Sequence, residues 1–187
     1  VHLTDSAVPP ASLKQLAGRP WSGRWYGFTR FHPLLTRPDF CRDLRRSGCV
    51  MLQLGLESGS PAVLRRLNKG IDLGQASAAL KALSGAGVAT YLYVMFGTPG
   101  EEREDALQTL QFVADHSPHI GFINTSLLNL PLSSPEEEDL ARRPYPGAPD
   151  LSLYEEFSHD TGWDRRAARK FLEREFARHP DVAPILR

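Results

Sequence analysis

The chain has 187 residues, of which 41% are hydrophobic, and it carries 22 basic and 22 acidic side chains. This length and composition allow one globular domain with its own core. The balanced charge excludes a strong whole-domain attraction to nucleic acid or to an acidic membrane, so we expect neither partner. Cys41 and Cys49 are the only cysteines. Two thiols exclude a disulfide framework and favour reduced, buried side chains in a cytoplasmic protein.

No apolar run reaches the roughly eighteen residues of a transmembrane helix. Residues 1–10 lack the basic and apolar segments of a signal peptide. Strand-like and helix-like patterns then alternate. Residues 1–4 and 24–31 predict short strands, and residues 9–18 predict a helix between prolines and a glycine. Residues 36–48 predict a second helix, with Thr36 as N-cap, Asp39 completing an acidic capping box and Gly48 at its end.

Residues 49–56 are almost continuously apolar, which is typical of a strand buried on both faces. Ser60 and Pro61 predict the start of a helix over residues 60–70, and another helix follows over residues 72–87. Residues 88–97 predict a strand, residues 101–117 an amphipathic helix, and residues 120–130 the last strand. The apolar stripe of the helix over 101–117 consists of Leu107, Leu110, Val113 and Ala114.

From about residue 131 the sequence becomes rich in proline and acidic residues, which predicts a long connection. One amphipathic helix follows over residues 163–180. The alternation predicts an α/β fold with a parallel sheet over residues 1–130, and residues 131–187 are interpreted as a linker and a helical extension. Right-handed crossovers would roll such a sheet into either an open sheet or a barrel, and the pattern does not separate the two.

Ligands of parallel α/β folds bind at the C-terminal ends of the strands. The predicted strands end at Asp5, Arg30, Glu57 and Gly97, so these residues would converge on one cavity. Structural roles are open alternatives, because Asp5 can cap a turn, Arg30 can form a surface ion pair and Gly97 can belong to an ordinary turn. Glu57 is the strongest candidate, because a carboxylate after an apolar strand needs partners, although the backbone of its own turn could supply them.

Other catalytic motifs are not found in this sequence. The six histidines show no metal-ligand spacing and neither cysteine has a histidine partner, so no zinc site is expected. Residues 97–100 do not match a phosphate-binding loop. The sequence also has no nucleophile elbow and no dinucleotide fingerprint.

Three segments together resemble the radical S-adenosylmethionine (SAM) superfamily. They are GLESGS at residues 55–60, NKG at 68–70 and FGTPGEE at 96–102, in the order found in that family. The resemblance is to the subgroup that often carries an upstream cobalamin-binding domain, and it covers about residues 1–130. It implies a partial (β/α)6 barrel of the TIM type, in which this chain supplies strands two to six.

The resemblance also implies a site for SAM at the ends of strands three to five. By matching position, Glu57 and Ser58 would reach the ribose or the methionine part of SAM. Arg30 and Lys69 would lie near its carboxylate. Tyr93 would line the adenine side.

Gly97 would back Tyr93, and Asp5 would stand near the amino group of SAM. The family's cluster motif, Cys-x3-Cys-x2-Cys after strand one, is missing from the sequence, as is strand one. We therefore expect this chain to be the C-terminal piece of a longer protein and to hold no metal itself. The ligands of the [4Fe-4S] cluster would lie in the remainder of that protein.

The function implied is that of a radical SAM enzyme. The full-length protein would use a [4Fe-4S] cluster to cleave SAM reductively, forming a 5′-deoxyadenosyl radical that acts on an unidentified small-molecule or peptide substrate. A catalytically silent α/β binding or scaffold module is the alternative, and an unrelated barrel enzyme with Glu57 as base is a third interpretation. A barrel that begins at residues 1–4 would expose a sheet edge, which favours self-association.

Overall fold

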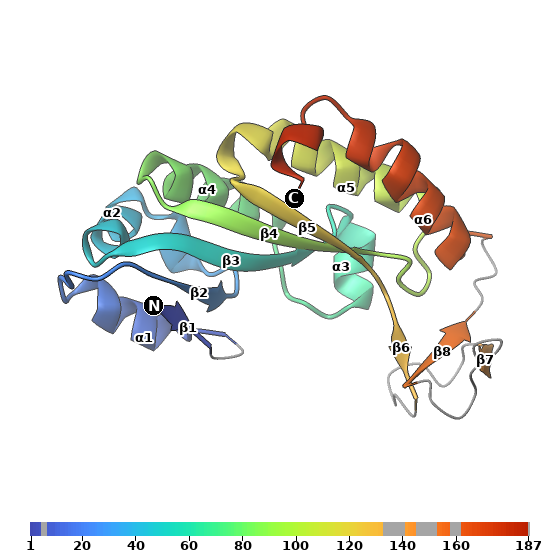
Figure 1. Ribbon diagram of the computed structural model, residues 1–187, viewed down its shortest axis with the longest axis horizontal. Helices are drawn as coiled ribbons and strands as arrows, with labels where there is room; N and C mark the ends of the chain where they lie inside the picture. The colour runs from blue at the N-terminus through green and yellow to red at the C-terminus, as the bar shows by residue number, and fades with distance from the viewer. Residues whose placement is uncertain (5–6, 133–140, 145–152, 158–161, 187) are drawn as a thin grey trace.

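The computed structural model describes residues 1–4, 7–132, 141–144, 153–157 and 162–186. A five-stranded parallel sheet, in the order β1-β2-β3-β4-β5, lies at its centre (Figure 1). The strands are β1 (His2–Leu3), β2 (Trp25–Thr29), β3 (Cys49–Glu57), β4 (Ala89–Phe96) and β5 (Phe122–Leu127).

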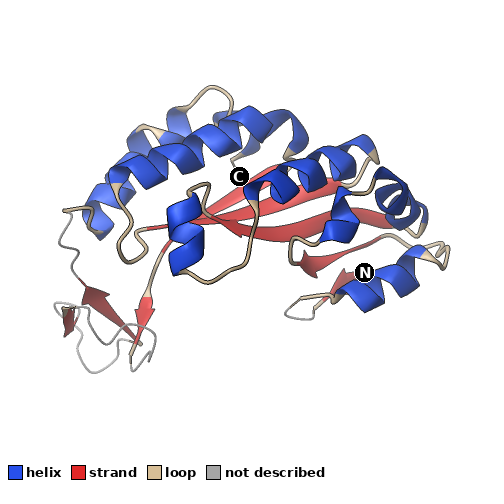
Figure 2. Ribbon diagram, turned by 180° about the vertical axis from the view of Figure 1, so that it is seen from behind, coloured by secondary structure: helices blue, strands red, loops and turns tan. Residues whose placement is uncertain are grey.

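Helices cover one face of this sheet. They lie behind it in Figure 1 and in front of it in Figure 2, where the sheet is seen from the other side. The α-helices are α1 (Pro10–Ala17), α2 (Pro38–Arg46), α3 (Pro61–Arg66), α4 (Leu73–Gly85), α5 (Arg103–His116) and α6 (Arg165–Arg174). Short 3-10 helices are η1 (Pro33–Thr36), η2 (Ser117–His119), η4 (Phe176–Arg178) and η5 (Ala183–Ile185).

The strand order decides between an open sheet and a barrel. Each new strand is added on the same side of the one before it, so right-handed crossovers all fall on the same face. A doubly wound sheet would reverse its strand order and carry helices on both faces. The predicted α/β fold with a partial barrel is therefore confirmed, and the barrel is not closed. β1 forms one edge of the sheet, and beside β5 a single bridge joins Ile123 to Leu186.

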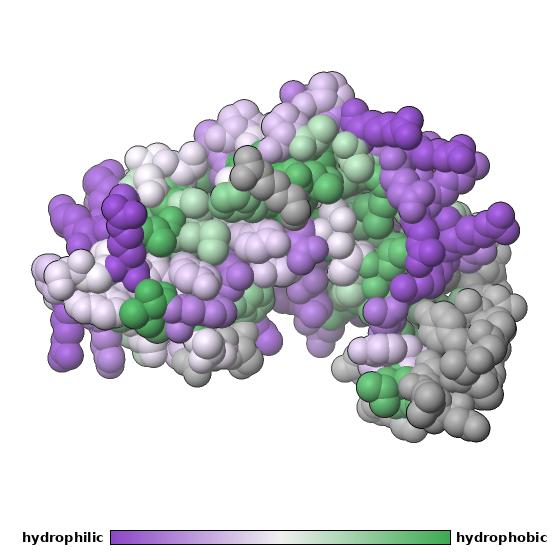
Figure 3. Space-filling model, in the orientation of Figure 1, coloured by the Kyte–Doolittle hydropathy of each residue, from purple (hydrophilic) through white to green (hydrophobic). Residues whose placement is uncertain are grey.

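The two faces of the sheet differ in burial. The residues of β3 and β4 that point to the helices are fully buried: Leu52, Leu54, Leu56, Leu92, Val94 and Phe96. The alternate residues, among them Met51, Gln53, Tyr91 and Tyr93, are only half-buried. The prediction that β3 is buried on both faces is therefore wrong, because the open barrel leaves one face uncovered. Figure 3 shows this uncovered face as a mixture of hydrophilic and hydrophobic patches.

Several predicted helix details need correction. The N-cap of α2 is Arg37 and not Thr36, because Pro38 takes the first helical position and the Thr36 hydroxyl donates to the carbonyl of Pro33 (2.8 Å) within η1. Gly48 does end this helix, with a φ of 92°. In α5 the predicted stripe is partly wrong.

Leu107 and Leu110 of α5 are only half-buried. The buried side of this helix includes Asp105 and Thr109 as well as Ala106, Val113 and Ala114. Its first turns face the polar turn after β3, which explains why two polar residues replace leucines on the buried side.

The C-terminal segment is more divided than predicted. α6 ends at Arg174 and η4 follows, so residues 163–180 do not form one helix. The predicted last strand over 120–130 is divided, because β5 ends at Leu127 and β6 (Leu130–Pro131) follows. β6 forms a small antiparallel sheet, in the order β6-β8-β7, with β7 (Arg142–Pro144) and β8 (Tyr154–Phe157) of the predicted connection. Other parts of that connection lie outside the described residues, and the division at residue 130 stays a prediction. None of the described helices combines the length and the apolar character needed to cross a membrane.

Candidate functional site

The end of β3 has an irregular backbone. Glu57 has a φ of 65°, and the N–H of Ser58 donates to the carbonyl of Leu56 (2.8 Å), which closes a tight turn around Glu57. The pairing with β4 slips at the same point, because Gly55 pairs with Tyr93 while Glu57 pairs with the next residue of β4. A positive φ costs a non-glycine residue about 1–2 kcal/mol. Such bulges re-aim side chains and are frequent beside active sites.

The irregular turn directs the carboxylate of Glu57 back over the sheet. A Cβ atom added to Gly55 would lie 2.8 Å from Oε1 of Glu57 and 3.5 Å from the ring of Phe28. Nζ of Lys69, in the loop after α3, lies 3.6 Å from the same oxygen. The side chains of Glu57 and Lys69 are 21% and 42% exposed, so the pair lies at the uncovered face and a ligand can reach it.

Aromatic rings stand next to this carboxylate. The ring of Tyr93 stacks on Tyr91 with centroids 4.9 Å apart and meets Phe28 edge-on at 6.2 Å. The amide of Gln53 donates to the Tyr93 hydroxyl (3.1 Å). Burial, with a smaller contribution from Tyr91, raises the pKa of Tyr93. Flat rings beside a carboxylate and an ammonium group can bind a planar heterocycle that carries hydroxyl or charged groups.

The remainder of the Glu-Ser-Gly-Ser segment faces α5 and not the uncovered face. The buried hydroxyl of Ser58 lies 3.0 Å from the hydroxyl of Thr109, which also accepts the N–H of Gly59 (2.9 Å). A Cβ on Gly59 would lie 2.7 Å from the Cα of Thr109. Because the Ser58 hydroxyl is buried and hydrogen-bonded to Thr109 of α5, only the backbone of Ser58 could contact a ligand at the uncovered face.

Asp105 organises the same turn, and sequence reasoning missed it. Its carboxylate accepts the hydroxyl of Ser60 (2.5 Å), the guanidinium of Arg66 (3.1 Å) and the N–H of Glu102 (3.1 Å). Ser60 also caps α3 as predicted, by accepting the N–H of Ala62 (3.2 Å). The available signal was the cluster of acids at the start of the predicted helix, which is favourable near a helix N-terminus whether or not one acid is buried.

Gly97 lies at the end of β4 with a φ of 70°. Its N–H and that of Thr98 (3.0 Å) both donate to Oε2 of Glu101, which also accepts the indole N–H of Trp163 (3.3 Å). Glu101 is fully buried, and this burial raises its pKa to about 7. Glu101 was not among the predicted site residues, although it stands in the FGTPGEE segment.

The predicted residues are thus brought together to different degrees. Glu57, Lys69 and Tyr93 lie around Gly55, and Gly97 ends the neighbouring strand. Arg30 is exposed at the end of β2 and forms no hydrogen bond or ion pair with any residue that the structure describes. Asp5 lies outside the described residues. The binding roles of all seven predicted residues stay predictions.

The cysteines do not fit an iron–sulfur cluster, which is held by several cysteine thiolates. Cys41 and Cys49 are both fully buried, and burial raises their pKa to about 11 and about 12. The Cys41 thiol donates to the carbonyl of Leu35 (3.2 Å). Among the described residues, no group of three or more His, Cys, Asp or Glu side chains could hold a metal ion.

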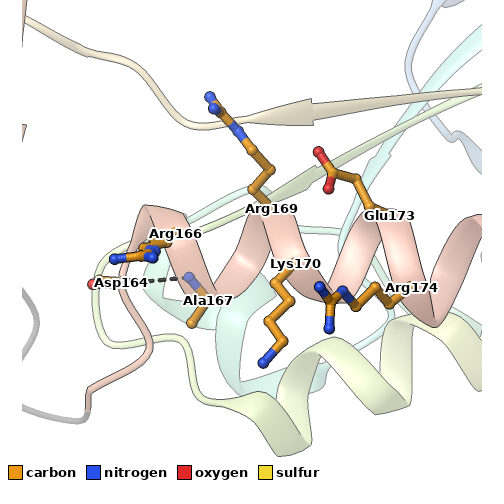
Figure 4. A pocket seen from close by; sticks show the side chains of 7 residues that line it. All are labelled: Asp164, Arg166, Ala167, Arg169, Lys170, Glu173 and Arg174. Atoms are coloured by element: carbon orange, nitrogen blue, oxygen red, sulfur yellow. Dashed lines mark hydrogen bonds between the residues drawn. The ribbon is translucent and has the colours of Figure 1, made fainter.

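Glu57 is not among the lining residues of two surface hollows. One, of about 430 Å³, lies between α3 and α4, and Asn68 and Gly70 of the NKG segment are among its lining residues. The other, of about 550 Å³, lies along α6 (Figure 4). Its charged lining residues carry both signs and come from α6 and its N-cap: Asp164, Arg166, Arg169, Lys170, Glu173 and Arg174. None of them is a predicted site residue.

Comparison with known proteins identifies the family. The family model for the radical SAM superfamily matches residues 17–113, more than half of the chain. The chain belongs to the radical SAM superfamily. The resemblance read from the GLESGS, NKG and FGTPGEE segments is therefore confirmed.

Individual relatives match over shorter spans. The heme chaperone HemW of Mycobacterium tuberculosis is 31% identical over 83 residues, which are 44% of this chain and 21% of HemW. The chain thus spans about a fifth of the curated relatives that it matches.

Solved radical SAM proteins share the fold. The radical SAM methyltransferase TsrM of Kitasatospora setae, described with a SAM analogue bound, aligns at a TM-score of 0.57 with 20% identity over 69% of this chain and 27% of TsrM. The coproporphyrinogen III oxidase HemN of Escherichia coli aligns at 0.52 with 18% identity over 64% of this chain and 29% of HemN.

Proposed function

We propose that this chain forms the SAM-binding side of a radical SAM enzyme. The observation that carries the proposal is the strained backbone of Glu57, which folds its carboxylate over Gly55 at the uncovered sheet face, beside Lys69 and Tyr93. A residue holds a positive φ only where the surrounding structure imposes it, and such strain concentrates at functional sites. Family membership supplies the ligand class.

The described residues fit SAM by their chemistry. The Glu57 carboxylate can accept hydrogen bonds from ribose hydroxyls or from the ammonium group of the methionine part. Lys69 and Arg30 offer cationic groups for the SAM carboxylate, and the ring of Tyr93 can stack on adenine. In the proposed full-length enzyme, SAM supplies a 5′-deoxyadenosyl radical on reductive cleavage.

The [4Fe-4S] cluster does not fit the cysteines of this chain, so the proposal assigns its ligands to a part of the protein beyond this sequence. No step of the chemistry is assigned to Cys41 or Cys49. The burial of both thiols also favours a second candidate function, that of a catalytically silent α/β binding or scaffold module without a cluster. Iron and sulfide analysis of the full-length protein separates the two, because only the enzyme would bind the cluster stoichiometrically.

One of the structures of TsrM is described with cobalamin and a [4Fe-4S] cluster, and an upstream cobalamin-binding domain stays a prediction for this protein. We propose that the substrate of the full-length enzyme is a small molecule or a peptide. We propose a cytoplasmic location, because two cysteines do not form the disulfide framework of a small secreted domain. We also propose that, in this chain by itself, the edge of β1 pairs with a second copy, which concentration-dependent sedimentation would detect.

Titration of the chain with SAM, followed by amide NMR shifts, tests the proposed site. We expect shifts that saturate and concentrate at Glu57, Lys69 and Tyr93. Glu57→Gln should weaken binding roughly tenfold, as expected for the loss of one charge-assisted hydrogen bond. The matched control is Glu104→Gln, an exposed carboxylate on α5, which should bind like the wild type. Equal affinity of the Glu57 variant and the wild type would remove Glu57 from the site.

A further inference from the structure

One buried carboxylate joins two distant segments at the C-terminal end of β4. Oε2 of Glu101 accepts the N–H groups of Gly97 and Thr98, which belong to the loop directly after β4. It also accepts the indole N–H of Trp163, which lies 62 residues further along the chain, just before α6. The loop and the segment that begins α6 are therefore bound to the same oxygen atom.

Aromatic packing holds α6 at the same place. Phe96, the last residue of β4, packs against Phe171 (5.9 Å between centroids) and Phe176 (5.2 Å). Trp163 meets Phe171 edge-on at 5.7 Å. Ala168 lies directly over the loop, since a Cβ on Gly97 would be 3.7 Å from that of Ala168.

A backbone contact extends this docking to β5. The guanidinium of Arg165 donates to the carbonyl of Leu128 (2.6 Å), and the N–H of Leu128 donates to the carbonyl of Phe96 (2.9 Å). α6 is thus fastened to the ends of two neighbouring strands. Figure 1 shows α6 along this edge of the sheet, on the side where the strands end.

We propose that Glu101 is a positioning residue through which α6 sets the shape of the loop after β4. The loop keeps its conformation because the carboxylate holds two of its N–H groups, and the carboxylate keeps its position because Trp163 holds it from the other side. Residues 162–186 would therefore hold the loop after β4 in place, and would not be an accessory extension. The consequence for SAM binding, through Gly97, rests on the proposed function, whereas the coupling itself does not.

The groups around Glu101 define what a titration would report. Among the described residues, Asp105 of α5 is the charged neighbour, and its negative charge adds to the effect of burial on the pKa of Glu101. Arg66 of α3 partly offsets that charge through its ion pair with Asp105. From the side of α6, Asp164 follows Trp163 and is occupied in capping the helix through the N–H of Ala167 (2.7 Å) (Figure 4).

The test follows the amide protons of Gly97 and Thr98 and the indole proton of Trp163 by NMR during a pH titration of the whole chain. If one carboxylate holds all three, their shifts share a single midpoint near 7, where the pKa of Glu101 lies. Trp163→Phe keeps the ring contact with Phe171 but removes the indole donor. Loss of one hydrogen bond to the charged form should raise the midpoint at Gly97 and Thr98 by roughly one pH unit.

The matched control is Trp21→Phe, because Trp21 is exposed. It should leave the midpoint unchanged. Different midpoints for the three protons, or an unchanged midpoint in Trp163→Phe, would overturn the proposal. The wild-type titration already tests the shared carboxylate if a variant does not fold.

SAM titration of the same proteins adds a second readout. We expect Trp163→Phe to bind SAM about threefold or more weakly than Trp21→Phe, which is within the range expected for a mutation that acts on a site without touching the ligand. If the wild type shows a common midpoint but does not bind SAM, the coupling stands and the proposed function fails. If SAM binds and Trp163→Phe matches the control, the proposed effect of α6 on SAM binding is refuted.

Discussion

Replacing Glu101 by Gln should change how the stability of the protein depends on pH. Burial raises the pKa of Glu101 from 4.5 to about 7 in the folded chain, while the unfolded chain keeps the ordinary value. Between these values the folded protein holds a proton that the unfolded chain releases, so stability falls as the pH rises. A difference of about 2.5 pH units at about 1.36 kcal/mol per unit gives a loss of about 3 kcal/mol, complete just above the folded pKa.

Urea unfolding at a series of pH values measures this effect. Glu101→Gln does not ionise, so its free energy of unfolding relative to the wild type should rise by about 3 kcal/mol between about pH 4.5 and pH 8. Taking the difference between two proteins removes the contribution of the histidines, which both share. Glu104→Gln, at an exposed position of α5, is the control and should follow the wild type. Parallel stability curves for Glu101→Gln and the wild type would refute the assigned burial of a charged group.

Two substitutions and one labelling experiment test the packing of the chain. Gly59→Ala should destabilise the chain by about 1–3 kcal/mol in urea unfolding, because the added Cβ would collide with the backbone of α5. Gly85→Ala is the control and should not destabilise the chain in this way, because the space around Gly85 is open. Equal effects of the two substitutions would contradict the close approach of Gly59 to α5. Ser60→Ala should lower the free energy of unfolding by about 2 kcal/mol, because it removes the N-cap of α3 and the hydroxyl that donates to the buried carboxylate of Asp105. A loss below about 0.5 kcal/mol would contradict both roles of Ser60. Cys41 and Cys49 should react with a disulfide reagent only as fast as the protein unfolds, because both thiols are buried and their pKa values are raised. Immediate reaction of either thiol in the folded protein would contradict its burial.

Local signals predicted the helices and strands well where the interaction lies within a few residues. Ser60 caps α3 through the N–H of Ala62, two residues away, and Gly48 ends α2 through its own φ. Thr36 failed as an N-cap because a competing local preference, Pro38 at the first helical position, moved the start of the helix by one residue. The apolar run of β3 wrongly predicts burial on both faces, because Met51 and Leu52 are both apolar and only the fold decides which face each one occupies.

The candidate site divides in the same way. The sequence alone predicted that Glu57 lies at a strand end, which the structure confirms, and the family resemblance predicted a SAM site beside it. Only the tertiary structure showed that Ser58 turns to Thr109, 51 residues away, and that Glu101 reaches Trp163, 62 residues away. Periodicity, caps and turn residues determine elements because their partners are neighbours in the chain. Strand order, the uncovered face and the partners of buried polar groups depend on which distant surfaces pack together, and no local pattern specifies that choice.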